Sequence, residues 1–388
     1  MKRIAVVTAT RAEYGLLAPV IRELRRAEDE GLRVEVVVTG THLSEAHGLT
    51  VTEIHQDGVR VEHEIAIPVA SASALDISRN QAETLVKFTE LFLQQNYKAI
   101  LLLGDRYETL AIATAACNTR TPIFHIGGGD TTEGALDECI RHSITKMSYL
   151  HFTTNETSRR RVIQLGEAPE RVFNCGSTSI DNIMTVANFT KSEAMASVSL
   201  SNERYALCTY HPVTLEDGDI TAQVNDLLEA IQAFPDVEFI ITKANADQGG
   251  GKINRLLDQA GEKIPNLHVF ASLGVRRYLS LMRYAQFVLG NSSSGIIEAP
   301  SFHIPTVNIG DRQRGRLQSE TVVNCAPDAA SIIRAIKGAM SDEMRARCRT
   351  AVSPYGDGHA APRIAAKSLE AVRQGIGLKK KFYDLDVR

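Results

Sequence analysis

The amino-acid sequence predicts an α/β protein made of two doubly wound, Rossmann-like domains. Short runs rich in β-branched residues alternate with longer segments of helical spacing along nearly all of the 388-residue chain. These runs are apolar at consecutive positions, as expected of parallel strands that helices cover on both faces. The alternation pauses once, over a polar stretch at 188–202, and then starts again. A single pause between two similar halves indicates two domains.

The predicted elements follow one another in a regular order. The strands of the first half are "RIAVVTA" (3–9), "RVEVVVTG" (33–40), "AILLLG" (99–104), "PIFHIG" (122–127), "YLHFTT" (149–154) and "RVFNCG" (171–176). Helical spacing separates them, for example at 16–26 and 78–95. The strands of the second half are "YALCTY" (205–210), "VEFIIT" (237–242), "LHVFAS" (267–272), "QFVLGN" (286–291) and "TVNIG" (306–310).

We therefore expect the first domain to span residues 1–176 and the second to span 177–361. A helix-like segment at 362–374 lies in a tail, 362–388, that we expect to return to the first domain. Two such domains face a central cleft, and ligands of doubly wound sheets bind outside the carboxyl ends of the strands. The cleft is thus the predicted functional site.

Composition excludes several classes of partner. A formal net charge of -3 gives no bulk electrostatic reason to bind nucleic acid or an anionic membrane. The first apolar run is too short for a signal peptide, and no stretch is long enough to cross a bilayer. Six cysteines without a Cys-x-x-Cys pair predict reduced core thiols in a cytoplasmic protein. The basic run at 379–381 is expected to be solvated.

Polar loops follow the predicted strands again and again. In the first domain these loops are "TRAEYG", "GDRYE" and "GGGDTTEGALDE"; in the second they are "HPVT", "KANAD", "GNSSSG" and "GDRQRGR". Because the carboxyl ends of parallel strands share one edge of a sheet, these loops gather at the cleft. We count Arg106, Asn245 and Asp247 in these loops among the predicted substrate contacts.

The segment "GNSSSGIIEAP" (290–300) is the best predicted phosphate site. Ser292, Ser293 and Ser294 offer hydroxyl and backbone donors at a helix N-terminus, where the helix dipole favours an anion. Glu298, one turn further, is placed to accept hydrogen bonds from a ribose diol. The alternative is simple capping of a short helix that ends at Pro300. Capping accounts for one serine but not for three.

Three arginines are predicted to neutralise a diphosphate: Arg312 and Arg314 of the second domain, and Arg11 across the cleft.

The motifs of nucleotide cofactors and of metal sites are absent from the sequence or incomplete. No Gly-x-Gly-x-x-Gly follows the first strand, and the glycine-rich stretch at 247–254 lacks the residues of a P-loop, so no nucleotide cofactor is expected. His125 and His142 have acids nearby but no recognised ligand spacing, so no metal is expected.

The acids of the first domain are the candidates for chemistry. Asp105 ends an apolar strand, where a carboxylate has no packing role, and its neighbour Arg106 either keeps it ionised or simply neutralises it. Asp137 begins a helix and is equally consistent with N-capping and with catalysis. Glu133 lies in the glycine-rich loop. Two carboxylates on opposite faces of a sugar ring can remove and return a proton with inversion.

At these residues the chain resembles the UDP-N-acetylglucosamine 2-epimerase family, most closely its hydrolysing, bacterial sialic-acid and capsule branch. The shared motifs span nearly the whole chain: "TATRAEYG", "VVTGTHLS", "LLLGDRYE", "HIGGGD", "LDECIRHSITKMSYLHFTT", "RRVIQLGE", "HPVT", "GNSSSGIIEAP" and "NIGDRQRGR". The resemblance implies a GT-B fold and a UDP-sugar substrate. It also implies elimination of UDP to 2-acetamidoglucal, followed by addition of water to give N-acetylmannosamine.

The resemblance also implies roles for single residues. Asp105 and Asp137 match catalytic acids, and His211 of "HPVT" matches a histidine near the diphosphate. The matches to nucleotide contacts are Arg11, Ser292, Ser293, Glu298 and Arg312.

One position departs from the family pattern. Many members carry a catalytic glutamate where this chain has Gly127. Its role passes to Glu133 or Asp130, or Asp137 acts with water.

Alternative functions remain open from the sequence. A neighbouring branch acts on a UDP-2,4-diacetamido-2,4,6-trideoxyhexose in the legionaminic acid pathway. The rivals from other classes are a GT-B glycosyltransferase and a non-catalytic UDP-sugar sensor. We expect a homo-oligomer, either a dimer or a tetramer.

Overall fold

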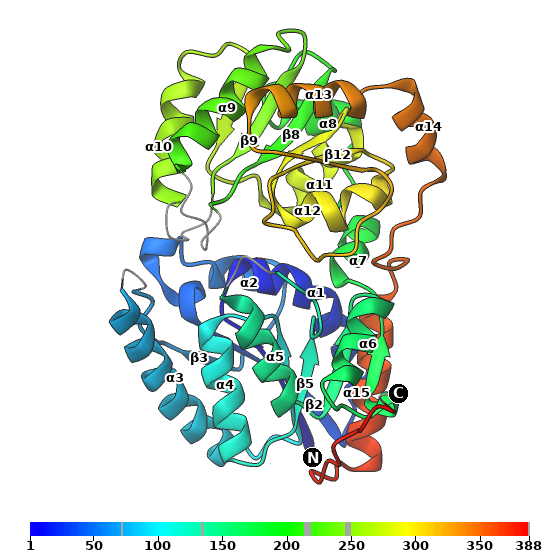
Figure 1. The fold of residues 1–388 in the computed structure, drawn as a ribbon. Coiled ribbons are helices and arrows are strands. Elements are labelled where there is room, and N and C mark those ends of the chain that lie inside the picture. The colour runs from blue at the N-terminus through cyan, green and yellow to red at the C-terminus, as the bar shows by residue number, and fades with distance from the viewer. Residues whose placement is uncertain (71–72, 133–135, 213–218, 245–249, 387–388) are drawn as a thin grey trace. The chain divides into compact units, whose positions relative to one another are not determined.

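The computed structural model describes residues 1–70, 73–132, 136–212, 219–244 and 250–386. The chain divides into two compact units (Figure 1). Unit 1 comprises Met1–Asp130, Leu136–Asp181 and Tyr355–Arg388, and unit 2 comprises Thr131–Ala135 and Asn182–Pro354. The main crossings thus follow Asp181 and Pro354, whereas the sequence placed them near residues 176 and 361.

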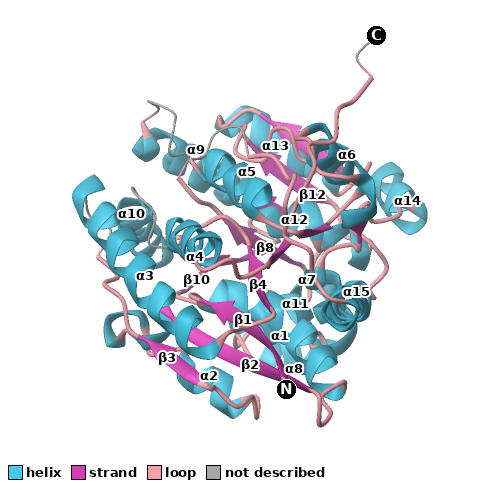
Figure 2. Ribbon diagram, turned by 90° about the horizontal axis from the view of Figure 1, so that it is seen from below, coloured by secondary structure: helices cyan, strands magenta, loops and turns pink. Residues whose placement is uncertain are grey.

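Unit 1 is built on a seven-stranded sheet in the order β3-β2-β1-β4-β5-β6-β7. All of its strand pairs are parallel, and β1, β2 and β3 lie side by side in Figure 2. The strands are β1 (Lys2–Thr8), β2 (Leu32–Thr39), β3 (His63–Ile65), β4 (Ala99–Leu103), β5 (Ile123–Ile126), β6 (Leu150–Thr153) and β7 (Val172–Asn174).

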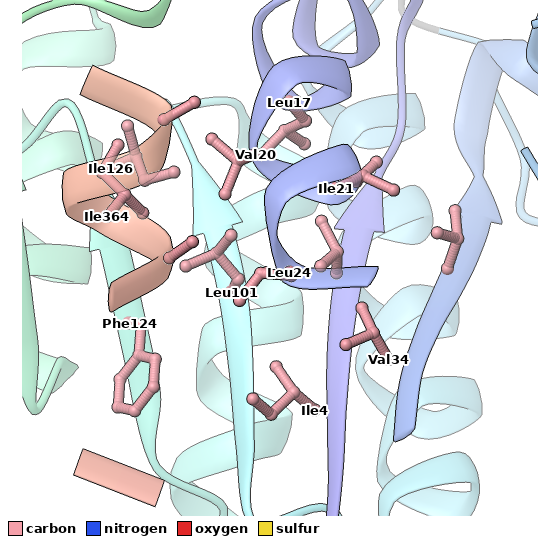
Figure 3. Close-up of a cluster of buried hydrophobic side chains, with 14 of the residues drawn as sticks. Ile4, Leu17, Val20, Ile21, Leu24, Val34, Leu101, Phe124, Ile126 and Ile364 are labelled. Atoms are coloured by element: carbon pink, nitrogen blue, oxygen red, sulfur yellow. The ribbon is translucent and has the colours of Figure 1, made fainter. Parts of the chain in front are cut away.

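Helices cover both faces of this sheet. They are α1 (Arg11–Arg26), α2 (Val51–Gln56), α3 (Ala74–Gln95), α4 (Tyr107–Asn118), α5 (Asp137–Met147), α6 (Glu156–Gln164), α7 (Thr178–Thr185, at the crossing) and α15 (Ala360–Gln374), with short 3-10 turns at Gly40–Leu43, Glu45–His47 and Pro169–Arg171. One core joins α1 and α15 to the sheet, and Figure 3 shows Leu24 of α1 beside Leu101 and Ile364 of α15 beside Ile126. A second core joins α3, α4 and α5 to the sheet.

Unit 2 repeats the same strand order with six parallel strands, β10-β9-β8-β11-β12-β13. The strands are β8 (Tyr205–Thr209), β9 (Glu238–Thr242), β10 (Leu267–Phe270), β11 (Val288–Gly290), β12 (Thr306–Ile309) and β13 (Val322–Cys325). The helices are α8 (Lys191–Ala196), α9 (Ile220–Gln232), α10 (Gly250–Gly261), α11 (Gly274–Tyr284), α12 (Ser293–Ile297), α13 (Ala329–Ala339) and α14 (Asp342–Thr350), with a 3-10 turn at Ala299–Phe302. Cores on both faces confirm the predicted doubly wound fold.

The sequence missed two edge strands, β3 and β13. β3 has three residues, of which two are polar, and β13 has four that are not fully buried, so neither forms the long apolar run of a central strand. Helix α1 starts at Arg11, earlier than expected, because Thr10 and Glu13 form a capping box at its N-terminus. Among the described helices, none is both long and apolar enough to cross a bilayer.

The cysteines agree only partly with expectation. All six are free, and Cys175, Cys208 and Cys348 are buried as predicted. Cys117 and Cys139 are exposed, so the prediction of core thiols was wrong for these two. Both lie on helices, α4 and α5, whose outer faces meet solvent.

The C-terminal tail is anchored to unit 1 by a buried ionic cluster around Glu167. The Nζ of Lys380 lies 2.7 Å from Glu167 Oε2, and it also donates to the carbonyl oxygen of Ser148 at 2.7 Å. His151 Nε2 and Lys146 Nζ bond the same carboxylate at 3.0 and 2.6 Å. Burial acts to raise the pKa of Glu167, but these hydrogen bonds outweigh burial and lower the pKa to about 2. The prediction that the lysine run is solvated was therefore wrong for Lys380.

Replacing Lys380 by methionine is expected to destabilise the protein by about 1.5–3 kcal/mol, because a hydrogen bond to a buried charge is lost. Lys381→Met is the matched control, since Lys381 is exposed in the same run, and it should change stability little. Thermal unfolding of both variants at neutral pH gives the comparison. Equal stability of the two variants would show that the cluster does not hold the tail.

Candidate functional site

In each unit two of the predicted site loops lie where the strand order reverses. In unit 1 the reversal falls between β1 and β4, and in unit 2 it falls between β8 and β11. Connections leave these neighbouring strands in opposite directions, and this is where doubly wound sheets bind ligands. The loops after β1 and β4 carry "TRAEYG" and "GDRYE", and those after β8 and β11 carry "HPVT" and "GNSSSG".

Asp105 of unit 1 forms an ion pair with the buried Arg141 of α5. The Nε of Arg141 donates to Asp105 Oδ2 at 2.7 Å, and its Nη2 donates to the same oxygen. Its Nη1 donates to the Asp130 carbonyl oxygen at 2.8 Å and to Glu138 Oε2 at 2.9 Å. Arg141 is only 2% exposed, so it holds Asp105 in a fixed orientation at the end of β4.

The sequence assigned Arg106 as the partner of Asp105, and this was wrong. Arg106 Nε donates instead to Glu108 Oε1 at 2.6 Å. Arg141 lies 36 residues from Asp105 in the chain and reaches it because β5, which precedes α5, pairs directly with β4. No local pattern reveals such a pair.

The other acids of unit 1 differ in their surroundings. Asp137 is the first residue of α5 and is exposed, and Leu136 occupies the N-cap position, so the N-cap interpretation of Asp137 was wrong. Asp130 Oδ1 accepts hydrogen bonds from the hydroxyls of Thr154 at 2.7 Å and Ser158 at 2.6 Å. These bonds give Asp130 a structural role. Glu133 lies outside the described residues.

The glycine-rich loop follows a buried, neutral histidine. His125 Nε2 lies 2.9 Å from the Gly104 carbonyl oxygen, and burial lowers the pKa of His125 to about 4. His142 Nε2 lies 3.1 Å from Glu138 Oε1, on the same helix. Gly127 has φ of +85°, a conformation that L side chains rarely adopt, although a Cβ there would meet no atom within 4 Å. Gly127 therefore has a backbone conformation suited to glycine and borders open space among the described residues.

Asn291 organises the site of unit 2. Its Oδ1 accepts from the His211 backbone N–H at 2.7 Å, and its Nδ2 donates to the His211 carbonyl oxygen at 2.8 Å. The Asn291 carbonyl oxygen in turn accepts from Arg312 Nη1 at 3.1 Å and Gln313 Nε2 at 2.9 Å. Asn291 is fully buried. One residue therefore joins the loops after β8, β11 and β12, a role for which the sequence carries no signal.

His211 and Arg312 lie close together in this site. Burial, reinforced by the charge of Arg312, lowers the pKa of His211 to about 4, so the imidazole is neutral at pH 7. By contrast, the side chain of Arg314 is 69% exposed, and its guanidinium lies 3.7 Å from Asp311.

The three serines differ in what they do. Ser292 is the N-cap of α12, and its Oγ accepts from the Ser294 N–H at 3.4 Å, so the capping alternative holds for this residue. Helix α12 has only five residues, Ser293–Ile297, and Glu298 is its C-cap. Ser293 and Ser294 are the first two residues of the helix and are partly exposed.

The remaining predicted contacts are Arg11, Asn245 and Asp247. Arg11 begins α1, and its Nη1 lies 3.8 Å from Glu53 Oε1 in a solvent-exposed pair. Asn245 and Asp247 lie outside the described residues.

Comparisons with known proteins agree on one family. A family model described as UDP-N-acetylglucosamine 2-epimerase matches residues 23–369. The GDP/UDP-N,N'-diacetylbacillosamine 2-epimerase (hydrolyzing) of Campylobacter jejuni is 38% identical over 83% of this chain and 84% of its own. The polysialic acid biosynthesis protein P7 of Escherichia coli is 34% identical over 99% of this chain and 98% of its own.

The fold also resembles that of a solved UDP-GlcNAc 2-epimerase. The crystal structure of the UDP-GlcNAc 2-epimerase of Neisseria meningitidis bound to UDP-GlcNAc superposes with a TM-score of 0.81 at 20% identity. The match covers 96% of this chain and 100% of that one. This likeness confirms the predicted GT-B-like architecture.

Proposed function

The chain belongs to the UDP-N-acetylglucosamine 2-epimerase family and is a hydrolysing 2-epimerase of UDP-sugars, and on this premise we propose that its substrate is UDP-N-acetylglucosamine. The products are UDP and N-acetylmannosamine, for use in sialic acid biosynthesis. The similarity to the polysialic acid biosynthesis protein P7 along 99% of the chain supports this choice of sugar. Family membership favours an epimerase over a glycosyltransferase or a non-catalytic sensor.

We assign the nucleotide to unit 2. Ser292, Ser293 and Ser294 donate to the phosphates, and Glu298 accepts from the ribose hydroxyls. Arg312 meets the charge of the diphosphate, and its hydrogen bond to Asn291 supports this orientation. The neutral imidazole of His211 adds a donor without adding charge. From unit 1, Arg11 and Arg106 contribute further positive charge.

We assign the chemistry to unit 1, and the observation that carries this assignment is the ion pair of Asp105 with Arg141. Both hydrogen bonds from Arg141 end on Oδ2, so the carboxylate cannot rotate freely. Asp105 takes the proton from C2 while the electrons of the breaking C1–O bond leave with UDP. Water then adds its hydroxyl to C1, and a proton returns to C2 on the opposite face, with Asp137 as the second acid.

A second substrate has a specific observation in its favour. The Campylobacter jejuni relative, which is 38% identical, is named for N,N'-diacetylbacillosamine, a 2,4-diacetamido sugar. The test is to incubate the protein separately with UDP-N-acetylglucosamine and with UDP-N,N'-diacetylbacillosamine, without any acceptor, and to measure free UDP and kcat/KM. We expect the higher kcat/KM for UDP-N-acetylglucosamine. The reverse order would replace the proposed sugar, and no UDP from either would reject the reaction.

The nucleotide assignment predicts weaker UDP binding in two variants. Ser292→Ala and Arg312→Ala each remove a donor to a charged phosphate, which is worth about 1.5–3 kcal/mol. Calorimetry with UDP should therefore show an affinity loss of roughly 10-fold or more for each variant. Arg345→Ala is the control, since Arg345 pairs with Asp342 on the exposed face of α14. Unchanged affinity in both test variants would remove the nucleotide from this loop.

A further inference from the structure

Two buried carboxyl groups lie at the strand reversal of unit 1, and the mechanism above does not use them. Glu13 of α1 is 8% exposed and Glu108 of α4 is 2% exposed. Glu13 Oε2 accepts from the backbone N–H groups of Ala9 at 2.8 Å and Thr10 at 3.2 Å. Its Oε1 and the Oε2 of Glu108 are buried without a hydrogen-bond partner among the described residues.

In the part of the chain that the structure describes, Arg106 is the cation that acts on both carboxyls. Arg106 Nε donates to Glu108 Oε1 at 2.6 Å, and its charge also acts on Glu13. With both acids ionised, the group of three would carry a net negative charge and two unsatisfied acceptors in a buried site, which is costly. A single proton makes the group neutral and turns one unsatisfied acceptor into a donor. Burial, together with repulsion from Glu108, raises the pKa of Glu13 to about 7.

The other described polar groups around Glu13 do not supply a second positive charge. His42, from the turn after β2, is buried, and burial lowers its pKa to about 4, so it is neutral. On α1 itself, the guanidinium of Arg11 lies 3.8 Å from Glu53, and the hydroxyl of Tyr14 donates to Asp57 at 2.8 Å. The proton state of the two acids therefore sets the net charge around Arg106.

We propose that Glu13 keeps a proton in the folded protein, so that the Arg106 guanidinium balances only Glu108 and can also hold an anionic group of the substrate. Glu13 is then a positioning residue that acts through Arg106, whose side chain is 38% exposed and so is open to a ligand. This inference rests on the proposed function, in which the substrate carries a diphosphate. When Glu13 loses its proton, the charge of Arg106 is balanced by two carboxylates, and the substrate then binds less tightly.

The first test measures the proton by stability rather than by activity. Because Glu13 has a raised pKa when folded, the folded state binds more protons than the unfolded state between about pH 4.5 and 7. Wild-type stability therefore falls as the pH rises through this range. Glu13→Gln keeps a neutral side chain at every pH, so its melting temperature relative to wild type should rise from pH 5 to pH 8 by roughly 5 °C.

Glu193→Gln is the matched control, and its stability relative to wild type should change with pH in the opposite direction. Glu193 occupies the same N3 position in the capping box of α8, but it is exposed, and hydrogen bonds from Thr190 lower its pKa. Its variant should therefore be less stable than wild type at pH 8, and the difference should shrink toward pH 4. If Glu13→Gln followed the same course as Glu193→Gln, the proton on Glu13 would be rejected.

The second test measures the effect on binding. Between pH 6 and pH 9 the wild-type KM for UDP-N-acetylglucosamine should rise by about 10-fold, whereas Glu13→Gln should keep a nearly constant KM. Glu108→Gln should flatten the profile in the same way, because it removes the negative charge that raises the pKa of Glu13, while the glutamine oxygen still accepts from Arg106. Identical KM profiles in the wild-type protein and in both variants would overturn the inference. A wild type that releases no UDP would reject the proposed function, and the stability test would still decide about the proton.

Discussion

Replacing Asp105 by asparagine is expected to lower turnover by about 10²–10⁴-fold while leaving the affinity for UDP near the wild-type value. The C2 proton of the sugar is not acidic in the resting substrate, because no carbonyl group activates it. It becomes labile only as the C1–O bond to UDP stretches and the ring gains positive charge. A base held against C2 then completes the elimination, and Asp105→Asn keeps the shape of that base but not its charge.

The structure adds a control to this experiment. Asp105→Asn also removes a charged partner from the buried Arg141, so part of its effect is on stability. Glu138→Gln removes another acidic partner of the same guanidinium, at 2.9 Å, without touching the proposed base. We expect both variants to lose stability, but only Asp105→Asn to lose turnover by orders of magnitude. Similar turnover in the two variants would mean that Asp105 serves only to pair with Arg141.

Isotope incorporation tests the same step independently. In D2O the wild-type reaction should place deuterium at C2 of the released sugar, because that proton is lost and then replaced from solvent. Mass spectrometry of the product measures this directly. A product without deuterium, together with a fully active Asp105→Asn variant, would refute the elimination.

The second large effect is expected from Asn291→Ala. This substitution leaves the N–H and the C=O of His211 without the partners that now lie at 2.7 and 2.8 Å. Each unsatisfied buried group costs about 1–3 kcal/mol, so unit 2 should lose about 2–6 kcal/mol of stability. UDP affinity should fall as well, because the loop that holds His211 is released from β11.

Asn266→Ala separates stability from binding. Asn266 is also buried, and its Nδ2 donates to the carbonyl oxygens of Phe234 at 3.0 Å and Val237 at 2.9 Å, just before β10 begins. That position is at the amino edge of the sheet, away from the predicted nucleotide loops. Thermal unfolding should show a loss for both variants, whereas calorimetry should show weaker UDP binding for Asn291→Ala alone. Wild-type affinity in Asn291→Ala would deny it a role in shaping the site.

The fold class could be predicted from the sequence because the signals that indicate it are local. A buried parallel strand needs a run of apolar residues, and a helix that packs on it needs apolar residues at helical spacing, so both patterns are written in consecutive positions. The same reasoning found the polar loops at the strand ends. It failed at β3, where three residues with two polar side chains carry no such pattern.

The sequence by itself thus determined two doubly wound units, the polar loops at the ends of their strands and the family to which the chain belongs. Only the tertiary structure decided which charges meet: Arg141 with Asp105 across 36 residues, Asn291 with His211 across 80, and Lys380 with Glu167 across 213. The physical reason is that strand order, not sequence distance, sets which loops are neighbours. A side chain's partner depends on that order, so the sequence suggested Arg106 for Asp105 where the fold supplies Arg141.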